Sequence, residues 1–235
     1  SPTLQEGGND YPFGYLFKTR ETASREREDW CGGVDLKVLA AAEQRALAWH
    51  DWFKHHAPSA IDSRCIVLNS QVLGTGHGLA KLPYIRDTRR SIGIDGFLLR
   101  FADLSGPAAQ LTGTQFNDRI ALGAYPADVH ALDNCDTPSY IVSAHETLPF
   151  YIPFRALTNN QLGNFLVAGK TMAQSFLANS ATRLHPIEWS SGTAAGVAAA
   201  WMALTGKTSR EALASIKELQ SLVETRTPIQ WTMNE

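Results

Sequence analysis

Two apolar segments between residues 163 and 206 constrain the fold more than any other part of the sequence. The run "NFLVAG" (164–169) is apolar without interruption after its first residue and ends in glycine, which is typical of a parallel β-strand covered on both faces. The later stretch "SSGTAAGVAAAWMALTG" (190–206) predicts a helix of small residues with Ser190 at its start and Gly206 as its C-cap. A buried strand followed by such a helix predicts a protein of the α/β class.

The letters Gly-Lys-Thr at 169–171 resemble a nucleotide-hydrolase phosphate loop, but their spacing argues against that site. Such a loop places four residues between its first glycine and the Gly-Lys pair. Here five residues separate Gly163 from Gly169, and they are mostly apolar. The stretch "GTGHG" (74–78) is an equally weak dinucleotide signal, because no strand leads into it and no helix follows. We interpret it as a loop.

The rest of the chain predicts an irregular arm (1–33), a helix over 35–56 and a set of short strands. The strand candidates are "CIVLNS" (65–70), "GFLLRFA" (96–102), "DRIALGAY" (118–125) and "SYIVSAH" (139–145), which turn residues separate as in an antiparallel or mixed sheet. A last helix follows from Thr208, which forms a capping-box pattern with Glu211.

Charge and composition argue against several kinds of partner. The formal net charge is −2, so no overall field attracts the chain to nucleic acid. The longest apolar run is too short to span a bilayer. The 3 cysteines form no C-x-x-C pair and have no histidine partners at zinc spacing, which predicts no structural metal.

The start of the small-residue helix is the first candidate binding site. A helix N-terminus offers unpaired N–H groups and a partial positive charge to a ligand. The small residues Ser190 to Thr193 would let a flat ring approach closely. Tight helix packing through glycine and alanine explains the same pattern, and spacing alone leaves both interpretations open.

An ordered set of motifs resembles the C-terminal portion of FAD-dependent oxidoreductases of the two-dinucleotide-binding-fold type. The set comprises "NFLVAGK" (164–170), "ANSATR" (178–183) and "GTAAGVAA" (192–199), with "PYIRDTRRSIG" (83–93), "RIALGAYPADVH" (119–130) and "YIPFRAL" (151–157) as further similar stretches. The resemblance implies part of a Rossmann-like FAD domain (158–206), a helix plus mixed-sheet substrate region (34–157) and a C-terminal helix and tail (207–235). The implied cofactor is FAD, and the implied substrate is a small molecule.

The sequence departs from that family at one point. Such enzymes hold the ADP half of FAD with a strand–G-x-G-x-x-G–helix unit, and residues 1 to 80 contain none. We therefore expect a separate subunit, a proteolytic partner or a segment outside this sequence to supply that unit. We also expect the chain alone not to hold FAD tightly.

The resemblance implies which residues contact the cofactor. Gly169 and Lys170 would pass close to it at the end of the strand, and Arg183 is a further cofactor-binding candidate. The helix start would lie against the pyrimidine edge of the isoalloxazine, where negative charge develops on reduction. Its contributors would be Ser191, Gly192, Thr193 and Ala194.

Histidines are the candidate bases, because histidine changes protonation near neutral pH. His130 lies inside a family-like motif, and Asp128, two positions earlier, could orient it or line the same face. His185 lies between two cofactor motifs, and His77 in "GTGHG" is a candidate substrate contact. For each histidine an ordinary loop role is the alternative.

The basic group Arg86, Arg89 and Arg90 suits an acidic substrate or the FAD diphosphate, because arginine binds such anions in a bidentate way. Salt bridges to neighbours such as Asp87 are the alternative.

Two other functions remain open from the sequence. The chain could be a non-catalytic subunit that stabilises a flavoprotein partner. A metal-dependent oxygenase using Asp128, His130 and another histidine is a weaker possibility, because facial-triad sites usually show His-x-Asp rather than Asp-x-His.

Overall fold

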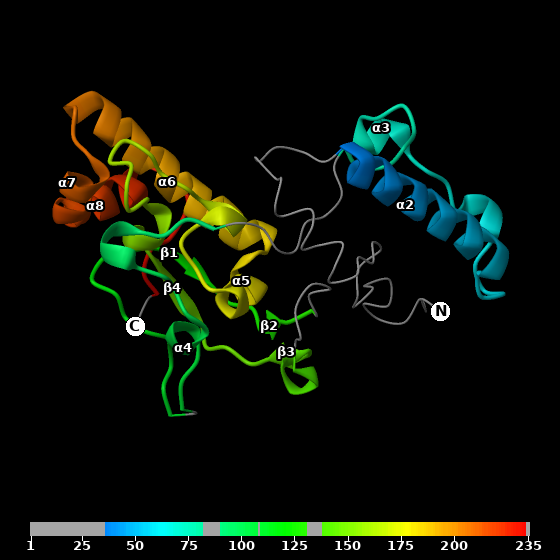
Figure 1. Ribbon diagram of the computed structural model, residues 1–235, viewed down its shortest axis with the longest axis horizontal. Helices are drawn as coiled ribbons and strands as arrows, with labels where there is room; N and C mark the ends of the chain where they lie inside the picture. Colours follow the sequence, from blue (N-terminus) through cyan, green and yellow to red (C-terminus); the bar gives the residue numbers. More distant parts are fainter. Residues whose placement is uncertain (1–35, 82–89, 108, 131–137, 234–235) are drawn as a thin grey trace. The chain divides into compact units, whose positions relative to one another are not determined.

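The computed structural model describes residues 36–81, 90–107, 109–130 and 138–233 (Figure 1). The chain divides into two compact units. The first unit comprises residues 1–85 and 130–139, and the second comprises residues 86–129 and 140–235. The predicted arm (1–33) lies outside the described residues.

The first unit contains the long helix α2 (Leu36–His56), which confirms the helix predicted over this stretch. Along one of its sides, Trp49 stacks on Phe53 with ring centroids 5.2 Å apart. At its C-terminus His55 and His56 donate from Nδ1 to the carbonyls one turn earlier, at 2.8 and 2.7 Å. Basic side chains near a helix C-terminus commonly bond to the carbonyls of the last turns in this way.

The strand predicted over 65–70 is wrong. The structure has the 3-10 helix η1 (Ser63–Cys65) and the helix α3 (Ser70–Leu73) there instead. Asp62 accepts the N–H of Arg64 at 3.0 Å, and Asn69 accepts the N–H of Val72 at 3.0 Å. These short-range caps give the backbone hydrogen bonds that compete with a strand ladder. Residues 74–78 form a loop, as predicted.

The second unit combines helices with two small antiparallel sheets, consistent with an α/β class. Strand β1 (Arg119–Gly123) pairs with β4 (Phe150–Pro153), which confirms the strand predicted over 118–125. Strand β2 (Ala127–Asp128) pairs with β3 (Ala144–His145). The strand predicted over 139–145 is therefore confirmed only in its last two residues, and residues 139–141 form the 3-10 helix η3.

The strand predicted over 96–102 is also wrong, apart from one bridge. Leu99 pairs in parallel with Gln174, and the short helix α4 (Phe101–Leu104) begins two residues later. The Asp103 carboxylate accepts the N–H of Arg100 at 2.8 Å, which starts that helix. Local capping again replaces an extended ladder.

The predicted core strand "NFLVAG" is wrong as well. Residues 164–168 form a loop with a single antiparallel bridge between Leu166 and Thr158, and the N–H of Val167 bonds to the carbonyl of Leu157 at 2.8 Å. Phe165 is 48% exposed, so the run is not covered on both faces. Its apolar pattern reflects partial packing, which periodicity alone does not distinguish from a buried strand.

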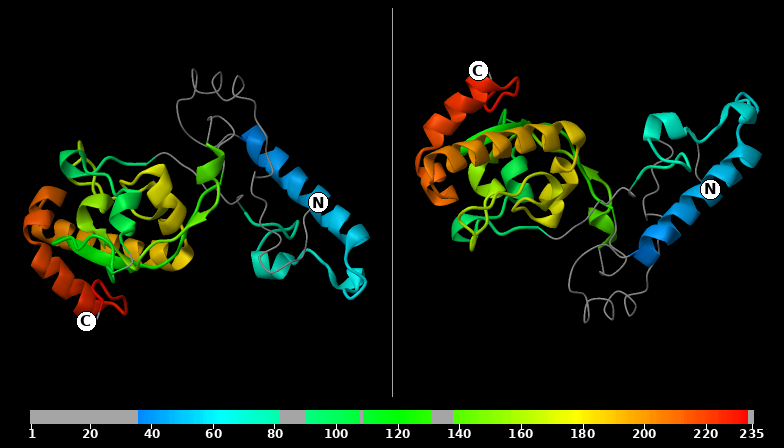
Figure 2. Two further views of the ribbon diagram at one scale, coloured as in Figure 1. Left: turned by 90° about the horizontal axis from the view of Figure 1, so that it is seen from below. Right: turned by 90° about the horizontal axis from the view of Figure 1, so that it is seen from above.

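Helix α6 (His185–Thr205) starts five residues before the predicted start at Ser190. Leu184 is its N-cap and Pro186 stands in its first turn, where the fixed φ of proline suits a helix. At the other end Gly206 has φ 68° and donates its N–H to Met202, which confirms the predicted C-cap. Figures 1 and 2 show α6 along one side of the second unit, with one face turned to β1.

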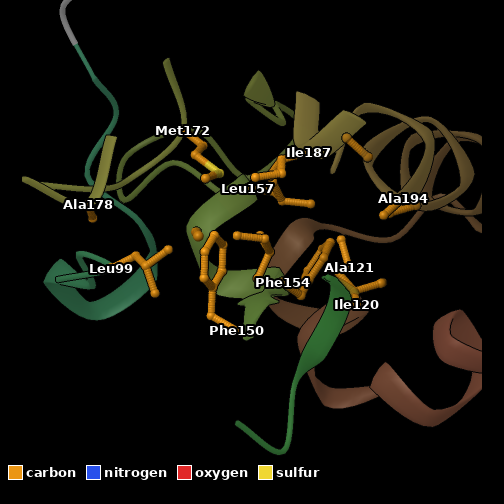
Figure 3. Close-up of a cluster of buried hydrophobic side chains, with 14 of the residues drawn as sticks. Leu99, Ile120, Ala121, Phe150, Phe154, Leu157, Met172, Ala178, Ile187 and Ala194 are labelled. Carbon is orange, nitrogen blue, oxygen red and sulfur yellow. The ribbon is translucent and has the colours of Figure 1, made fainter. Parts of the chain in front are cut away.

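The hydrophobic core of the second unit lies between α6 and the β1–β4 sheet (Figure 3). Phe150, Phe154 and Ile152 from the β4 segment are completely buried, as are Ile120 and Ala121 from β1. Burying each large side chain stabilises the fold by about 1.5–3 kcal/mol relative to leaving it in water. This core holds the segments that carry the candidate site.

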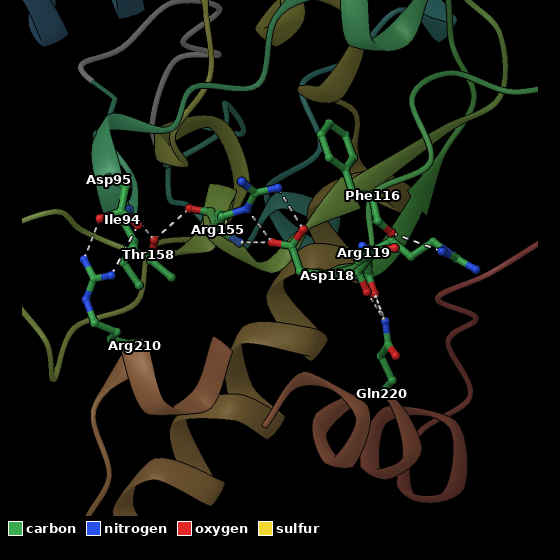
Figure 4. A network of polar contacts seen from close by, with 10 residues as sticks. Ile94, Asp95, Phe116, Asp118, Arg119, Arg155, Thr158, Arg210 and Gln220 are labelled. Atoms are coloured by element: carbon green, nitrogen blue, oxygen red, sulfur yellow. Dashed lines mark hydrogen bonds and ion pairs between the residues drawn. The ribbon is translucent and has the colours of Figure 1, made fainter. Parts of the chain in front are cut away.

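The predicted last helix is interrupted and forms α7 (Ser209–Ala214) and α8 (Ile216–Arg226). The capping box is confirmed, since Thr208 and Glu211 each accept from the other's backbone. Helix α8 is tied to β1 through Gln220, which donates to the carbonyls of Arg119 (2.8 Å) and Asn117 (3.2 Å) (Figure 4).

The capping box predicts a pH-dependent contribution to stability. The pKa of Glu211 is lowered because the Thr208 backbone N–H and then its hydroxyl donate to the carboxylate. A lowered pKa stabilises the fold above the carboxyl's ordinary pKa, and the contribution is lost as the pH falls through the lowered value. We expect Glu211→Ala to lower the melting temperature at neutral pH and to have no effect once the carboxyl is protonated. Thermal melts of both proteins across this range measure the difference, and an effect independent of pH would contradict it.

Candidate functional site

The candidate site is built on the junction between the 3-10 helix η5 (Gly169–Thr171) and helix α6, which pack together. Gly169 has φ 67°, a conformation that glycine adopts without strain. A Cβ placed there would lie 3.6 Å from Oε1 of Glu188, in the first turns of α6. The turn that ends the apolar run therefore lies against the beginning of α6.

A buried polar network joins η5 to the helix that follows it in the chain. Gln174, which is 2% exposed, donates to the carbonyl of Lys170 at 3.3 Å and to Asn179 Oδ1 at 3.2 Å. Thr182 donates to Gln174 Oε1. Asn179 and Thr182 share one face of helix α5 (Phe176–Thr182), because they are three positions apart. Satisfied buried groups of this kind specify one arrangement, so the network fixes η5 relative to α5.

Of the three arginines in the predicted basic group, Arg90 contacts the segment next to this junction. Arg90 donates from Nε to the carbonyl of Gln174 at 3.0 Å, and the N–H of Ser91 bonds to the carbonyl of Thr171 at 2.8 Å. Arg86 and Arg89 lie outside the described residues. The structure thus brings Arg90 together with the segment that carries Gly169 and Lys170.

Arg183 and Asp128 form an internal ion pair. Arg183 follows α5 directly and is 5% exposed. Its Nη2 donates to the carbonyl of Asp128 at 2.8 Å and approaches the carboxylate Oδ2 at 3.4 Å. A charged hydrogen bond in a partly buried setting is stronger than an exposed one. The pair fastens β2 to the α5–α6 junction, so two predicted site residues meet although they are 55 positions apart.

The four predicted cofactor contacts of α6 lie inside the helix rather than at its N-terminus. Ser191 and Ala194 are completely buried and face the core. Gly192 and Thr193 are half-buried, and the Thr193 hydroxyl donates to the carbonyl of Trp189 at 2.8 Å. Among the described residues, a Cβ at Gly192 would meet no heavy atom within 4 Å. Only Gly192 and Thr193 therefore combine small size with an outward position.

The predicted histidines occupy different settings. His185 is exposed at the first position of α6. His130 is half-buried and belongs to the first unit, as does His77, whose Nε2 lies 3.5 Å from Glu43 Oε1. Within the second unit, His185 is therefore the candidate base at the η5–α6 junction.

The described part of the chain offers neither a membrane span nor a metal cluster. No helix there is long and apolar enough to cross a membrane. In the same residues, no three histidine, cysteine or acidic side chains gather closely enough to hold a metal ion.

Sequence reasoning missed Glu188 and the Gln174 network. Glu188 lies before Ser190, where the sequence predicted the helix to start, so it was not considered as part of the helix. Pro186 in "HPIE" is nevertheless a signal for a first helical turn. Asn179 and Thr182 carried a weaker signal, namely polar residues at a helical spacing within a small-residue helix.

These features place the second unit among α/β domains in which a turn at a glycine packs against the first turns of a helix of small residues. The model of the family described as FAD dependent oxidoreductase matches residues 18–223, so the chain belongs to that family. FAD is its cofactor. No curated protein and no solved structure matches the chain.

Proposed function

We propose that this chain contributes the substrate region and the isoalloxazine side of the FAD site in a flavin-dependent oxidoreductase. The observation that carries the proposal is the contact of Gly169 with the first turns of α6, together with the open Cβ position at Gly192. Backbone without a side chain on two neighbouring segments suits a flat ring that must approach closely. FAD, when bound, supplies the acceptor for a hydride from the substrate.

Each residue of the junction receives a role in this proposal. Gly169, Lys170, Gly192 and Thr193 hold the ring system. Ser191 and Ala194 keep α6 on the core, as their complete burial suggests. Arg183 acts through Asp128 by fixing β2, because its side chain is only 6% exposed.

The proposed base is an imidazole. His185 stands at an exposed helix position where it can accept a proton from a substrate hydroxyl or amino group. His130, with Asp128 as the group that orients it, is the second candidate. Arg90, with Arg86 and Arg89, would bind an acidic substrate, because a guanidinium pairs with a carboxylate through two hydrogen bonds. His77, in the first unit, stays a proposed substrate contact of that unit considered by itself.

We assign the ADP half of FAD to a unit that carries a G-x-G-x-x-G loop, located on a second polypeptide or a further segment. Support comes from the sequence, which contains no such loop although the family is FAD-dependent.

The test uses the chain in complex with that loop-carrying unit. Gly192→Val is expected to weaken FAD retention about tenfold or more, because the branched side chain fills the position that the ring approaches. Visible flavin absorbance after ultrafiltration measures retention. Thr205→Val, at the exposed far end of the same helix, is the control and should retain FAD as the unmodified chain does.

Two results would count against the proposal. Stoichiometric, tightly bound FAD on the purified chain alone would contradict the assignment of the ADP half. Flavin that no hydroxy acid or amino acid of a broad panel reduces would favour a non-catalytic subunit instead.

A further inference from the structure

The sequence contains a single Asp-Gly pair, Asp95–Gly96, and no Asn-Gly pair. In both kinds of pair the backbone nitrogen after the acidic or amide residue is open to reaction, because glycine has no side chain to shield it. Asp95 and Gly96 are both exposed, and a Cβ at Gly96 would meet no heavy atom of the described residues within 4 Å. Both reacting groups of the pair are therefore accessible to water.

Asp95 also has an unusual backbone conformation. Its φ is 58°, and in the described part of the chain it is the one residue other than glycine with a positive φ. Aspartate tolerates this left-handed region better than most residues, but it stays there only where its surroundings impose it. The turn around it is closed by the N–H of Gly96 on the carbonyl of Gly93 and by the N–H of Gly93 on the carbonyl of Phe97, both at 3.0 Å.

Arg210 holds the carboxylate of Asp95 (Figure 4). Its Nη2 and Nη1 donate to Oδ1 and Oδ2 at 2.7 and 3.2 Å. Arg210 lies in the first turn of α7, which the capping box of Thr208 and Glu211 fixes. The pKa of Asp95 is lowered, chiefly because Arg210 donates to the carboxylate, and the charges of Arg210 and Arg155 act in the same direction.

The reaction open to an Asp-Gly pair requires a neutral carboxyl group. The nitrogen of Gly96 attacks Cγ of Asp95, and the amide proton leaves with the carboxyl OH as water, which closes a succinimide ring. A carboxylate ion offers no such leaving group. One water molecule then opens the ring. Cleavage between the nitrogen and Cγ restores aspartate, whereas cleavage of the original peptide bond gives isoaspartate, whose main chain runs through Cβ.

We propose that the Asp95–Gly96 bond is a site of spontaneous conversion to isoaspartate, and that the ion pair with Arg210 restrains this conversion by keeping the carboxyl group ionised. The reaction consumes no oxidant or other co-reactant, because the water released in the first step is taken up again in the second. Exposed ion pairs contribute little to folding stability, so the effect of Arg210 on this chemistry is separable from any effect on the fold. The reaction is independent of the proposed FAD site.

The product would disturb a tightly packed segment. Isoaspartate lengthens the main chain by one carbon next to Ile94, whose N–H donates to the Thr158 hydroxyl at 2.9 Å. It also breaks the turn that holds Gly93, where a Cβ would lie 2.3 Å from the carbonyl oxygen of Arg155. Conversion is therefore expected to lower the stability of the second unit.

Incubation of the purified protein at about pH 5, slightly above the ordinary pKa of aspartate, tests the site. Trypsin releases residues 91–100, "SIGIDGFLLR", in which Asp95 is the only acidic residue and asparagine is absent. Electron-transfer fragmentation then identifies isoaspartate at this position. Arg210→Ala is expected to raise its rate of formation about threefold or more, because one unit of pKa changes the neutral fraction tenfold. At a pH where the carboxyl is protonated in both proteins, the difference should disappear.

Arg64→Ala is the matched control. Arg64 binds both oxygens of the exposed Asp62 through Nε and Nη2, at 2.9 and 2.8 Å, but the next residue is Ser63, whose side chain shields its nitrogen. This variant should leave conversion at Asp95 unchanged, and conversion at Asp62 should stay well below that of Asp95 in Arg210→Ala. An unchanged denaturation midpoint of Arg210→Ala excludes unfolding as the cause of faster conversion.

Equal rates at Asp95 in the unmodified protein and in Arg210→Ala would overturn the role of Arg210. Asp95→Asn tests the geometry independently, because a side-chain amide closes the same ring at neutral pH with loss of ammonia. We expect this variant to lose its amide in the folded protein. An amide that persists in the folded protein and is lost only after denaturation would show that the turn prevents ring closure, and would overturn the site.

Discussion

Gly93→Ala is expected to destabilise the second unit by about 3 kcal/mol or more. A Cβ at position 93 would lie 2.3 Å from the carbonyl oxygen of Arg155, which is main chain and cannot rotate away. That carbonyl accepts hydrogen bonds from the hydroxyl (2.7 Å) and N–H (3.3 Å) of Thr158, and Thr158 in turn accepts the N–H of Ile94 at 2.9 Å. Moving the oxygen therefore disturbs several bonds at once (Figure 4).

A matched glycine supplies the control for that experiment. Gly196→Ala adds the same methyl group at a position where no heavy atom of the described residues lies within 4 Å of the new Cβ, so it should stabilise the fold by about 0.5–1 kcal/mol. Urea denaturation followed by circular dichroism measures both changes. Equal effects of the two substitutions would show that close approach at Gly93 does not limit stability.

Arg155→Ala is expected to lower the free energy of unfolding of the second unit by about 2–3 kcal/mol. Arg155 donates from Nε and Nη2 to the two oxygens of Asp118 at 2.9 and 3.1 Å, and its guanidinium lies 4.6 Å from the ring centroid of Phe97. The Asp118 side chain is 7% exposed, so removing its partner leaves a buried carboxylate without a counter-charge. Fully buried pairs cost about 3–5 kcal/mol when broken in this way. The expected value is lower because the Arg155 side chain is 35% exposed.

An exposed pair in the same unit distinguishes burial from charge pairing as the cause. Arg210 contacts Asp95 through two hydrogen bonds of 2.7 and 3.2 Å, but both side chains are more than half exposed. Exposed pairs contribute little, so Arg210→Ala should leave the denaturation midpoint unchanged. A double-mutant cycle of Arg155→Ala with Asp118→Asn should show coupling of about 1 kcal/mol or more. Additive effects would contradict the role of the ion pair.

Elements with strong local signals were predictable from the sequence. The helix over 36–56 has a continuous pattern of good helix formers, and the C-cap at Gly206 and the capping box of Thr208 depend on residues within one turn of each other. Strand β1 has β-branched and apolar residues between turns. The motif order indicated the FAD-dependent family, and the family match confirms it at that level.

The strand predictions that are wrong all concern short apolar runs. "CIVLNS", "GFLLRFA" and "NFLVAG" have strand-like composition, but side-chain caps or a single bridge decide their backbone. The predicted start of α6 at Ser190 is wrong for a related reason. Serine is a common N-cap, but the helix begins at His185, with Pro186 in its first turn. Short runs do not contain enough residues for periodicity to separate strand, turn and helix.

The sequence predicted which segments form the candidate site, but not how their side chains contact one another. Gly169, Lys170 and the small residues of α6 could be named, because glycine and small side chains are visible in a motif. The pairing of Arg183 with Asp128 and the support of η5 by Gln174 join residues that no local pattern relates.

The sequence by itself indicated the α/β class, the C-cap at Gly206, the capping box at Thr208, and the family with its cofactor FAD. The caps depend on hydrogen bonds between near neighbours in the chain, and the family shows in the order of motifs along the sequence. Only the tertiary structure decided that Ser191 faces the core, that Arg183 bonds to Asp128 inside the unit and that Ala199 and Ala203 of α6 are exposed. Burial and long-range pairing depend on which distant segments pack together, and the apolar stretch 194–204 of α6 carries no pattern that says which side will be covered.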